Sequence, residues 1–233
     1  MKNQTAGKSR LKYSGTGPGE QTLDGCSVEF YQQLPATDQE LACIVKGHPA
    51  PAKLLELGCG AGRLTHPLVK AGYTVTAVDN SQAMLSRIVG AAAVLSDIES
   101  LELETTYEVV LLASRLLNCP NDEIRNMMLA TARGHLEVGG TLLAEVHDPD
   151  ILKQKVGDGG AGEHYAASII SSQVIGSRAK ITIEYRVEQK RWRHSFETEY
   201  LPLSRIEAAL KINNLHFEEW INPSKTWMRV TAV

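Results

Sequence analysis

Several features that would narrow the class of this protein are scarce or missing from its 233 residues. The four cysteines are widely spaced, at Cys26, Cys43, Cys59 and Cys119, without a CxxC pair or a companion histidine spacing. This pattern does not match a zinc motif, and it favours reduced thiols over a disulfide framework. We therefore predict no metal site.

The chain also lacks a run of about 18 apolar residues, the length that a membrane-spanning helix needs. Its first thirty residues contain no apolar segment of the signal-peptide type. Lysine and arginine are scattered among aspartate and glutamate, and the formal net charge is −3, so no basic surface for nucleic acid is indicated. We expect a cytoplasmic protein, a monomer or homodimer, without membrane or nucleic-acid partners.

The most informative stretch is 54–65, LLELGCGAGRLT, in which an apolar run ends in a carboxylate and three alternating glycines. We interpret it as a strand, a tight turn and the start of a helix, because glycines permit positive φ angles and close approach of a ligand. The dinucleotide-binding pattern GxGxxG would need a glycine at position 63, which is Arg63 here. Glu56, just before the turn, disfavours a phosphate and favours a cationic or hydroxyl-bearing ligand.

From this stretch to residue 148, strand and helix patterns alternate, which is typical of a parallel sheet covered on both faces. A helix that begins after Asn121 is expected to run to Gly139-Gly140. The strands are expected at 53–57, 74–78, 92–95, 107–113 and 141–146.

The remaining segments flank this unit. Thr37 to Glu40 has the pattern of a helix capping box, and Ser204 is expected to cap a later helix. The glycine-rich stretch 149–162 is expected to be a flexible loop that acts as a lid. Alternating apolar residues predict an antiparallel meander over 169–200 and a closing strand pair at 217–221 and 226–232.

These patterns predict an α/β fold: a Rossmann-like, doubly wound, mostly parallel seven-stranded sheet whose last strand is antiparallel. They divide the chain into a flexible tail (1–20), which is mildly basic, an amino-terminal helical cover (21–49) and a cofactor-binding core (50–148). A loop with an antiparallel β insertion (149–201) is expected to cover the candidate site, and a helix with a strand pair (202–233) completes the core sheet.

Two more carboxylates follow expected strands of this core. Asp79 ends the second strand, 21 residues after Gly58, where a carboxylate can accept hydrogen bonds from both hydroxyls of a ribose. Asp97 and Ile98 follow the third strand, and could offer an acceptor to an exocyclic amine and an apolar wall to a purine.

Taken in order, Glu56 to Gly62, Asp79, Asp97-Ile98 and the segment after the fourth strand resemble class I S-adenosylmethionine-dependent methyltransferases over about residues 50–148. The resemblance implies S-adenosylmethionine as the cofactor, with the glycines under its methionine and ribose, Asp79 on the ribose and Asp97 with Ile98 at the adenine. Glu56 is implied near the methionine amine and Ser114 near the sulfonium. The cofactor-binding set implied is Glu56, Gly58, Cys59, Gly60, Gly62, Asp79, Asn80, Met84, Asp97, Ile98 and Ser114.

The sequence departs from this family in the loop after the fourth strand, which often carries Asp or Asn and here is Ala113-Ser114-Arg115-Leu116-Leu117-Asn118. His147-Asp148 does not reproduce the Asp-Asn pair of the metal-dependent catechol subgroup. His147 is the candidate base, because its unperturbed pKa is near 6.5 and it ends the fifth strand. Tyr31 and His147 are the candidate acceptor contacts.

We therefore expect a methyltransferase that acts on nitrogen or oxygen of a small molecule, in specialised metabolism. One alternative is methylation of a peptide natural product. A second is a nicotinamide-dependent oxidoreductase, which Arg63 and the lack of a Tyr-x-x-x-Lys pair disfavour. A third is a protein that binds the cofactor without turnover.

Overall fold

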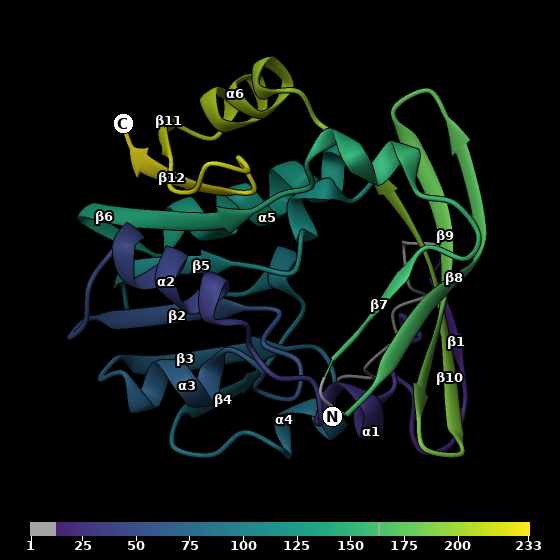
Figure 1. Cartoon of the computed structure of the whole chain (residues 1–233). Helices are drawn as coiled ribbons and strands as arrows, with labels where there is room; N and C mark the ends of the chain where they lie inside the picture. Colours follow the sequence, from purple (N-terminus) through teal and green to yellow (C-terminus); the bar gives the residue numbers. More distant parts are fainter. Residues whose placement is uncertain (1–12, 163) are drawn as a thin grey trace, which may run out of the picture.

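The computed structural model describes residues 13–162 and 164–233, and it contains two sheets that lie side by side (Figure 1). The central sheet has the strand order β11-β12-β6-β5-β2-β3-β4, in which β12 is antiparallel to both neighbours and the other pairs are parallel. This confirms the predicted doubly wound sheet with an antiparallel last strand. Its strands are β2 (Lys53–Leu57), β3 (Thr74–Asp79), β4 (Ala92–Leu95), β5 (Tyr107–Leu112), β6 (Leu136–Glu145), β11 (Leu215–Trp220) and β12 (Trp227–Ala232).

Helices cover both faces of this sheet because its middle strands carry buried apolar side chains on both faces. In β5, Val109 and Leu111 are fully buried in a cluster with residues of α2 and α3, whereas Val110 and Leu112 are fully buried with residues of α5 and α6. Burying a side chain of this kind stabilises the fold by about 1.5–3 kcal/mol. The helices are α2 (Asp38–Gly47), α3 (Thr65–Lys70), α4 (Gln82–Leu85), α5 (Asp122–Gly134) and α6 (Leu203–Ile212).

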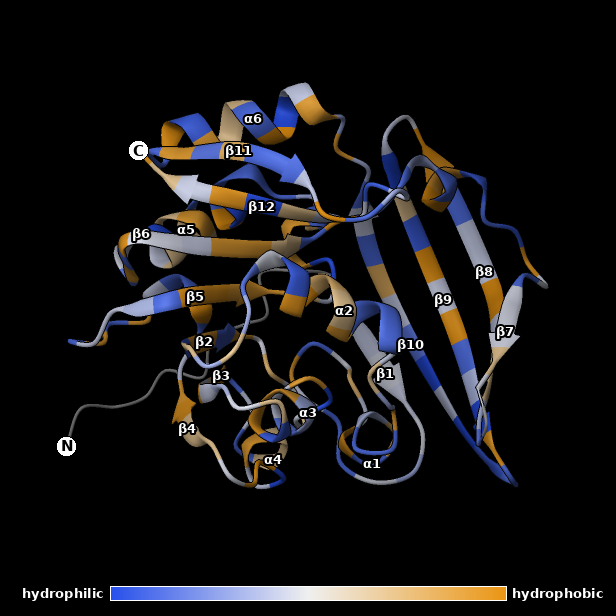
Figure 2. Ribbon diagram, turned by 60° about the vertical axis from the view of Figure 1, so that its left-hand side comes forward, coloured by the Kyte–Doolittle hydropathy of each residue, from blue (hydrophilic) through white to orange (hydrophobic). Residues whose placement is uncertain are grey.

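The second sheet is antiparallel, with the order β1-β10-β9-β8-β7. Its three long strands are the predicted meander, and Figure 2 shows apolar and polar residues alternating along β9. Two short edge strands, β1 and β7, were not predicted. The strands are β1 (Ser14–Thr16), β7 (Gly159–Ala161), β8 (Ala166–Ile175), β9 (Arg178–Val187) and β10 (Lys190–Glu199).

The short helix α1 (Val28–Tyr31) lies between the two sheets. On one side, the ring of Phe30 stacks on Tyr185, with 4.2 Å between ring centroids. On the other side, Val28 packs in a small apolar cluster with Ala61 and Met84 of the central unit. We call this contact zone the α1 seam. It brings the antiparallel sheet against the carboxyl ends of the parallel strands.

Two local predictions were wrong. The helix α5 ends at Gly134, and Gly139-Gly140 lie within β6, where Gly139 has a φ of +80° and the register with β5 slips. The helix α6 begins after Pro202, without a side-chain cap from Ser204.

The expected lid loop is partly regular. It contains the 3-10 turn η3 (Pro149–Lys153) and the edge strand β7. At Gly159 an added Cβ would lie 2.0 Å from the carbonyl oxygen of Ala167 in β8, so this glycine is needed for close strand approach. The predicted tail residues Lys2, Lys8, Arg10 and Lys12 lie outside the described part of the chain.

Candidate functional site

The glycine turn (residues 58–62) follows β2, and its backbone is held by the neighbouring strand β3. The N–H groups of Gly58 and Cys59 both donate to the carbonyl oxygen of Val78, at 2.9 Å each. A Cβ at Gly58 would lie 2.7 Å from Cδ1 of Leu116, whereas a Cβ at Gly60 would meet nothing within 4 Å. The turn is therefore closed on the side of Leu116 and open at Gly60, which suits close approach of a small molecule.

Asp79, at the end of β3, closes the turn from the other side. Its Oδ2 accepts a hydrogen bond from the N–H of Gly60 at 2.8 Å, and its Oδ1 accepts one from the N–H of Ser81 at 2.9 Å. Burial raises the pKa of this carboxyl above its usual value. Each carboxylate oxygen has a second lone pair, so Asp79 can still accept the two hydroxyls of a ribose.

The expected adenine side lies next to Gly58. The amide of Asn80 donates to Oδ1 of Asp97 at 2.9 Å, and both residues are exposed. Cδ1 of Ile98 lies 3.6 Å from the position that a Cβ would take at Gly58. The side chain of Leu116 contacts the same glycine. Leu116 was not among the predicted residues, although its place after the fourth parallel strand was a usable signal. Ile98 and Leu116 together supply apolar walls.

Three of the predicted cofactor-binding residues, Glu56, Cys59 and Met84, are buried in or beside the turn. Glu56 is buried, and its Oε2 accepts a hydrogen bond from the hydroxyl of Thr65 at 2.6 Å. Burial raises the pKa of Glu56 to about 7. Cys59 is also buried, and burial raises the pKa of its thiol, so it is neutral. Met84 is buried against Val28 in the α1 seam.

The loop after β5 (residues 113–118) carries two consecutive non-glycine residues with left-handed backbones, Ser114 at φ +55° and Arg115 at φ +58°. Both are held by Glu145, which accepts a hydrogen bond from the N–H of Ser114 at 2.8 Å and pairs with Arg115 at 2.9 Å. Glu145 is buried at the end of β6, and burial raises its pKa. Glu145 was not among the predicted residues, because no motif marks it at the end of its strand.

Arg63, which stands where a dinucleotide-binding turn has glycine, forms an ion pair with Glu40 of α2 at 2.7 Å. Its other guanidinium nitrogen reaches 3.5 Å from Oγ of Ser114. Arg63 therefore links the helix α2, the glycine turn and the loop after β5.

His147 follows β6, and its backbone N–H donates to Oδ1 of Asn118 at 2.9 Å. Burial, with a smaller contribution from the charge of Arg115, lowers the pKa of His147 to about 3. Its imidazole is therefore neutral at pH 7 and a weak base. Asn118 is buried, and its side-chain amide also donates to the carbonyl of Glu199 in β10.

Tyr31 lies in the α1 seam and has a different histidine as its partner. Its hydroxyl is 3.4 Å from Nδ1 of His194 in β10, and Nε2 of His194 is 3.2 Å from the carbonyl oxygen of Asp24. Cys26 lies beside this pair, with its sulfur 3.9 Å from Nε2. No sequence motif singled out His194, because the antiparallel pairing of β10 with β1 and the packing of α1 bring it here.

The residues present fit S-adenosylmethionine. The open face at Gly60, the carboxylate of Asp79 and the apolar walls at Ile98 and Leu116 suit a nucleoside. In the described ranges 13–162 and 164–233, no group of three or more His, Cys, Asp or Glu side chains is placed to hold a metal. In the same ranges, no helix is long and apolar enough to cross a membrane.

Comparison with known proteins agrees with this geometry. Residues 54–140 match the model of a family described as a methyltransferase domain. A curated relative, the cypemycin N-terminal methyltransferase of a Streptomyces species, is 29% identical over 112 residues, which are 45% of this chain and 46% of the relative. The match thus spans about half the length of that relative.

Solved structures share the fold over most of the chain. A S-adenosylmethionine-dependent methyltransferase from Clostridium acetobutylicum has a TM-score of 0.72 at 18% identity, with 88% of this chain and 96% of that chain covered. The CcbJ methyltransferase from Streptomyces caelestis has a TM-score of 0.72 at 21% identity, with the same coverage of both chains. The sugar N-methyltransferase KedS8 of a Streptoalloteichus species has a TM-score of 0.65 at 19% identity, with 88% and 91% covered.

Residues 54–140 thus match a methyltransferase domain, and the fold is shared with S-adenosylmethionine-dependent methyltransferases, in agreement with the resemblance drawn from the motifs. The fold is also shared by the glycopeptide N-methyltransferase MtfA, whose structure holds S-adenosylmethionine, with a TM-score of 0.61 at 17% identity and 86% and 96% of the two chains covered. This supports S-adenosylmethionine as the cofactor.

Proposed function

We propose that the chain transfers the methyl group of S-adenosylmethionine to a nitrogen atom of a small, amine-bearing natural product. The observation that carries this choice is the polar group of Tyr31, His194 and Asp24, which lies beside the glycine turn in a seam otherwise lined by apolar side chains such as Val28 and Met84. A hydroxyl and a neutral imidazole in such a place can accept hydrogen bonds from an amine. KedS8 is named a sugar N-methyltransferase, and the cypemycin relative is named an N-terminal methyltransferase.

The cofactor would be held by Asp79 at its ribose and by Ile98 and Leu116 at its adenine. When bound, S-adenosylmethionine supplies an electrophilic methyl group, which the acceptor nitrogen takes as the carbon–sulfur bond breaks and leaves its electron pair on sulfur. The protein's own part is to align the acceptor and to exclude water. The α1 seam and the antiparallel sheet provide that cover on the open side of the turn.

The acceptor class can be tested with the purified protein and S-adenosylmethionine that carries a labelled methyl group. The panel pairs nucleotide-linked amino sugars and short peptides having a free amino terminus with the matching hydroxyl sugars and amino-acetylated peptides. We expect label only on the free amines. Equal labelling of the hydroxyl sugars would refute the choice of nitrogen.

A second candidate acceptor, the α-amine of a peptide, is favoured by the name of the cypemycin relative. The same panel separates it from an amino sugar, because the two acceptors carry their amines on different scaffolds. Label on the peptides alone would select this second candidate.

Asp79→Asn tests the cofactor site separately from the acceptor. The variant loses the negative charge of the carboxylate that would accept hydrogen bonds from the ribose. A hydrogen bond to a charged group contributes about 1.5–3 kcal/mol. Calorimetry with S-adenosylhomocysteine is expected to show at least tenfold weaker binding, whereas Glu218→Gln, exposed on β11, is expected to bind as the unmodified protein does. Equal affinity in Asp79→Asn would contradict the assignment of Asp79.

A further inference from the structure

We propose that Tyr31 and His194 form a proton relay that removes a proton from the acceptor's ammonium group before the methyl group is transferred. This inference rests on the proposed function, because it states how the same site prepares an amine. Tyr31 is the group in contact with the amine, and His194 stores the proton.

The hydrogen bonds of His194 define which of its nitrogens can accept a proton. Nε2 lies 3.2 Å from the backbone carbonyl of Asp24, and a carbonyl can only accept, so Nε2 carries the hydrogen. Nδ1 therefore has a free lone pair, and the hydroxyl of Tyr31, at 3.4 Å, donates to it. The same hydroxyl also has the side chains of Cys26 and Tyr185 within hydrogen-bond reach. Its oxygen has two lone pairs, so it can accept a hydrogen bond from an amine when it donates to Nδ1.

The side chain of Tyr31 lies between His194 and the glycine turn. Tyr31 is half-buried and packs against the cluster of Val28, Ala61 and Met84, and Ala61 belongs to the glycine turn itself. His194 comes from β10, on the opposite side of the seam, with its ring 6.3 Å from that of Tyr31 in an edge-to-face arrangement. The relay thus runs from the antiparallel sheet towards the glycine turn.

The proton transfer balances without a further reactant. An N–H bond of the ammonium group breaks and its proton binds the oxygen of Tyr31, while the proton of Tyr31 moves to Nδ1 of His194. The nitrogen keeps its electron pair, and His194 becomes an imidazolium that still donates from Nε2 to Asp24. The proton returns to solvent by the reverse route after the product leaves.

Burial and the neighbouring Asp24 act on the pKa of His194 in opposite directions. Burial lowers the pKa of His194 and raises that of Tyr31, so both are neutral at pH 7 when an amine arrives. The other titratable groups that face the pair are Tyr13, Asp24, Cys26 and Tyr185, and burial also raises the pKa of Tyr13, Cys26 and Tyr185. The carboxylate of Asp24 is thus the nearby charge, and it favours the imidazolium form.

The first test does not need turnover. Nitrogen-15 NMR of the histidine side chains, on the full chain with S-adenosylhomocysteine at pH 7, is expected to show His194 neutral and protonated at Nε2. Tyr31→Phe should shift the Nδ1 resonance, because its hydrogen-bond donor is lost, and His216→Gln, exposed on β11, should leave it unchanged. A His194 that is protonated at Nδ1, or charged at pH 7, would overturn the relay.

The second test uses the amine that the acceptor panel labels best. General acid–base groups contribute about 100-fold or more to rates, so Tyr31→Phe and His194→Gln are each expected to lower kcat at least tenfold. His194→Gln should also remove the acidic limb of the kcat profile, while calorimetry shows unchanged S-adenosylhomocysteine affinity. His216→Gln should retain full activity.

The experiments distinguish a failure of the proton relay from a failure of the proposed function. If the unmodified protein labels an amine and His194→Gln keeps its kcat and pH profile, the relay is wrong and the proposed function stands. If the unmodified protein binds S-adenosylhomocysteine but labels no amine, the proposed function is wrong, and the relay fails with it.

Discussion

The carboxylate of Asp79 accepts hydrogen bonds from the backbone of the glycine turn, and the same carboxylate would accept the ribose hydroxyls of the cofactor. Its two oxygens accept N–H groups from Gly60 and Ser81, so it is oriented in the absence of any ligand. A carboxylate that is already oriented loses little conformational freedom when a ribose binds, and this favours affinity for the ribose. The glycines around it differ in what they permit, since Gly58 faces Leu116 and Gly60 faces open space.

Alanine substitutions at these two glycines should therefore separate stability from binding. Gly58→Ala combines a positive φ of +76° with a contact of 2.7 Å to Leu116, and we expect it to lower the free energy of unfolding by 2 kcal/mol or more, as roughly 1–3 kcal/mol comes from backbone strain alone. Gly60→Ala, with φ +55° and no contact, should destabilise less but weaken S-adenosylhomocysteine binding at least tenfold. Urea denaturation and calorimetry check both.

Gly176→Ala is the matched control, because it has a similar φ of +61° and no neighbour within 4 Å, and it lies between β8 and β9. It should show the strain of Gly60→Ala without its loss of affinity. If Gly60→Ala and Gly176→Ala bound S-adenosylhomocysteine equally well, the open face at Gly60 would not be the ligand site.

Glu56 gives the protein a specific pH dependence. Burial raises its pKa from 4.5 to about 7 in the folded state, so the folded protein binds a proton more tightly than the unfolded chain does. The free energy of unfolding should then fall as pH rises from about 4.5 to about 7, by on the order of 3 kcal/mol from this group. Glu56→Gln removes the titration and retains an oxygen that can accept the hydroxyl of Thr65.

Urea denaturation between pH 5 and pH 8 isolates this contribution as the difference between the two proteins. We expect Glu56→Gln to gain stability relative to the unmodified protein as pH rises, and Glu218→Gln to follow the unmodified protein at every pH. Parallel curves for Glu56→Gln and the unmodified protein would mean that Glu56 is not buried as a proton-binding group.

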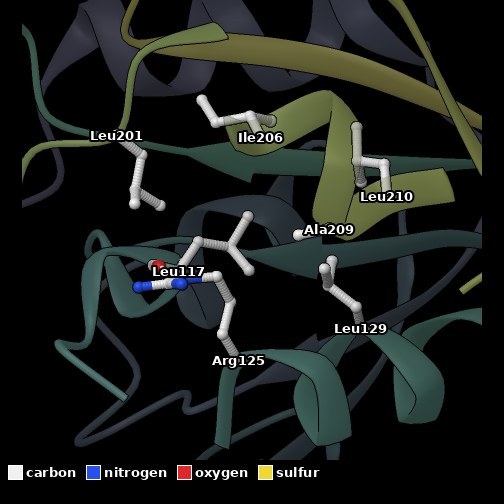
Figure 3. Close-up of a pocket in the computed structure, with 7 residues that line it drawn as sticks. All are labelled: Leu117, Arg125, Leu129, Leu201, Ile206, Ala209 and Leu210. Carbon is white, nitrogen blue, oxygen red and sulfur yellow. Dashed lines mark hydrogen bonds between the residues drawn. The ribbon is translucent and has the colours of Figure 1, made fainter. Parts of the chain in front are cut away.

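The loop after β5 and the strand β10 are joined by a buried arginine of α5. Arg125 donates from Nε to the carbonyl of Leu117 at 2.8 Å, donates to the carbonyl of Cys119, and forms an ion pair with Glu199 at 3.3 Å. Figure 3 shows its guanidinium next to Leu117, beneath a small cavity of about 10 Å³ lined by apolar residues of α5 and α6. That volume holds at most about one water molecule, so the cavity is a packing gap and no ligand site.

Arg125→Met should therefore loosen the attachment of the antiparallel sheet to the core. Removing one partner of a buried ion pair costs about 3–5 kcal/mol, and we expect a loss of that size in the free energy of unfolding. Hydrogen exchange should rise in β10 and in residues 113–118. The matched control is Arg178→Met, which removes an exposed partner of the same Glu199 at 3.8 Å and should cost about 1 kcal/mol or less.

Equal losses in the two variants would contradict the role of Arg125, since Glu199 also keeps Arg205 at 2.6 Å in both. A loss in Arg125→Met without faster exchange in β10 would place its effect within α5 alone.

The molecule as a whole joins a central α/β unit to an antiparallel sheet, and the candidate site lies where the two meet. The core supplies Asp79 and Ile98, the residues proposed to hold the cofactor, whereas the seam and the second sheet supply Tyr31 and His194. Acceptor and cofactor would thus be held by different parts of the fold. A ligand that binds only the folded state raises stability according to its affinity.

Thermal unfolding with ligands tests which cofactor class the whole chain accepts. S-adenosylhomocysteine at about 100 times its dissociation constant should add about 2.7 kcal/mol of stability and raise the unfolding midpoint. Reduced nicotinamide dinucleotide should leave the midpoint unchanged, because Arg63 stands where the dinucleotide turn needs glycine. A shift with the nicotinamide and none with S-adenosylhomocysteine would support the oxidoreductase alternative.

Much of the core fold followed from local pattern. The strands β2 and β4 have the predicted bounds, and the capping box at Thr37 and Glu40 is present as predicted. These features depend on residues close together in the chain, so short-range rules capture them. The end of α5 was missed because Gly139-Gly140 resemble a helix stop, yet the strand β6 passes through them.

The amino-acid sequence by itself determined the order of the core, the glycine turn and the carboxylates Asp79 and Asp97, because each is a local signal at the end of a strand. Only the tertiary structure decided that Tyr31 meets His194, that Glu145 holds Ser114 and that Arg125 joins the loop after β5 to β10. These contacts link residues 31 to 163 positions apart, and their partners are chosen by sheet pairing and packing, which no local pattern encodes.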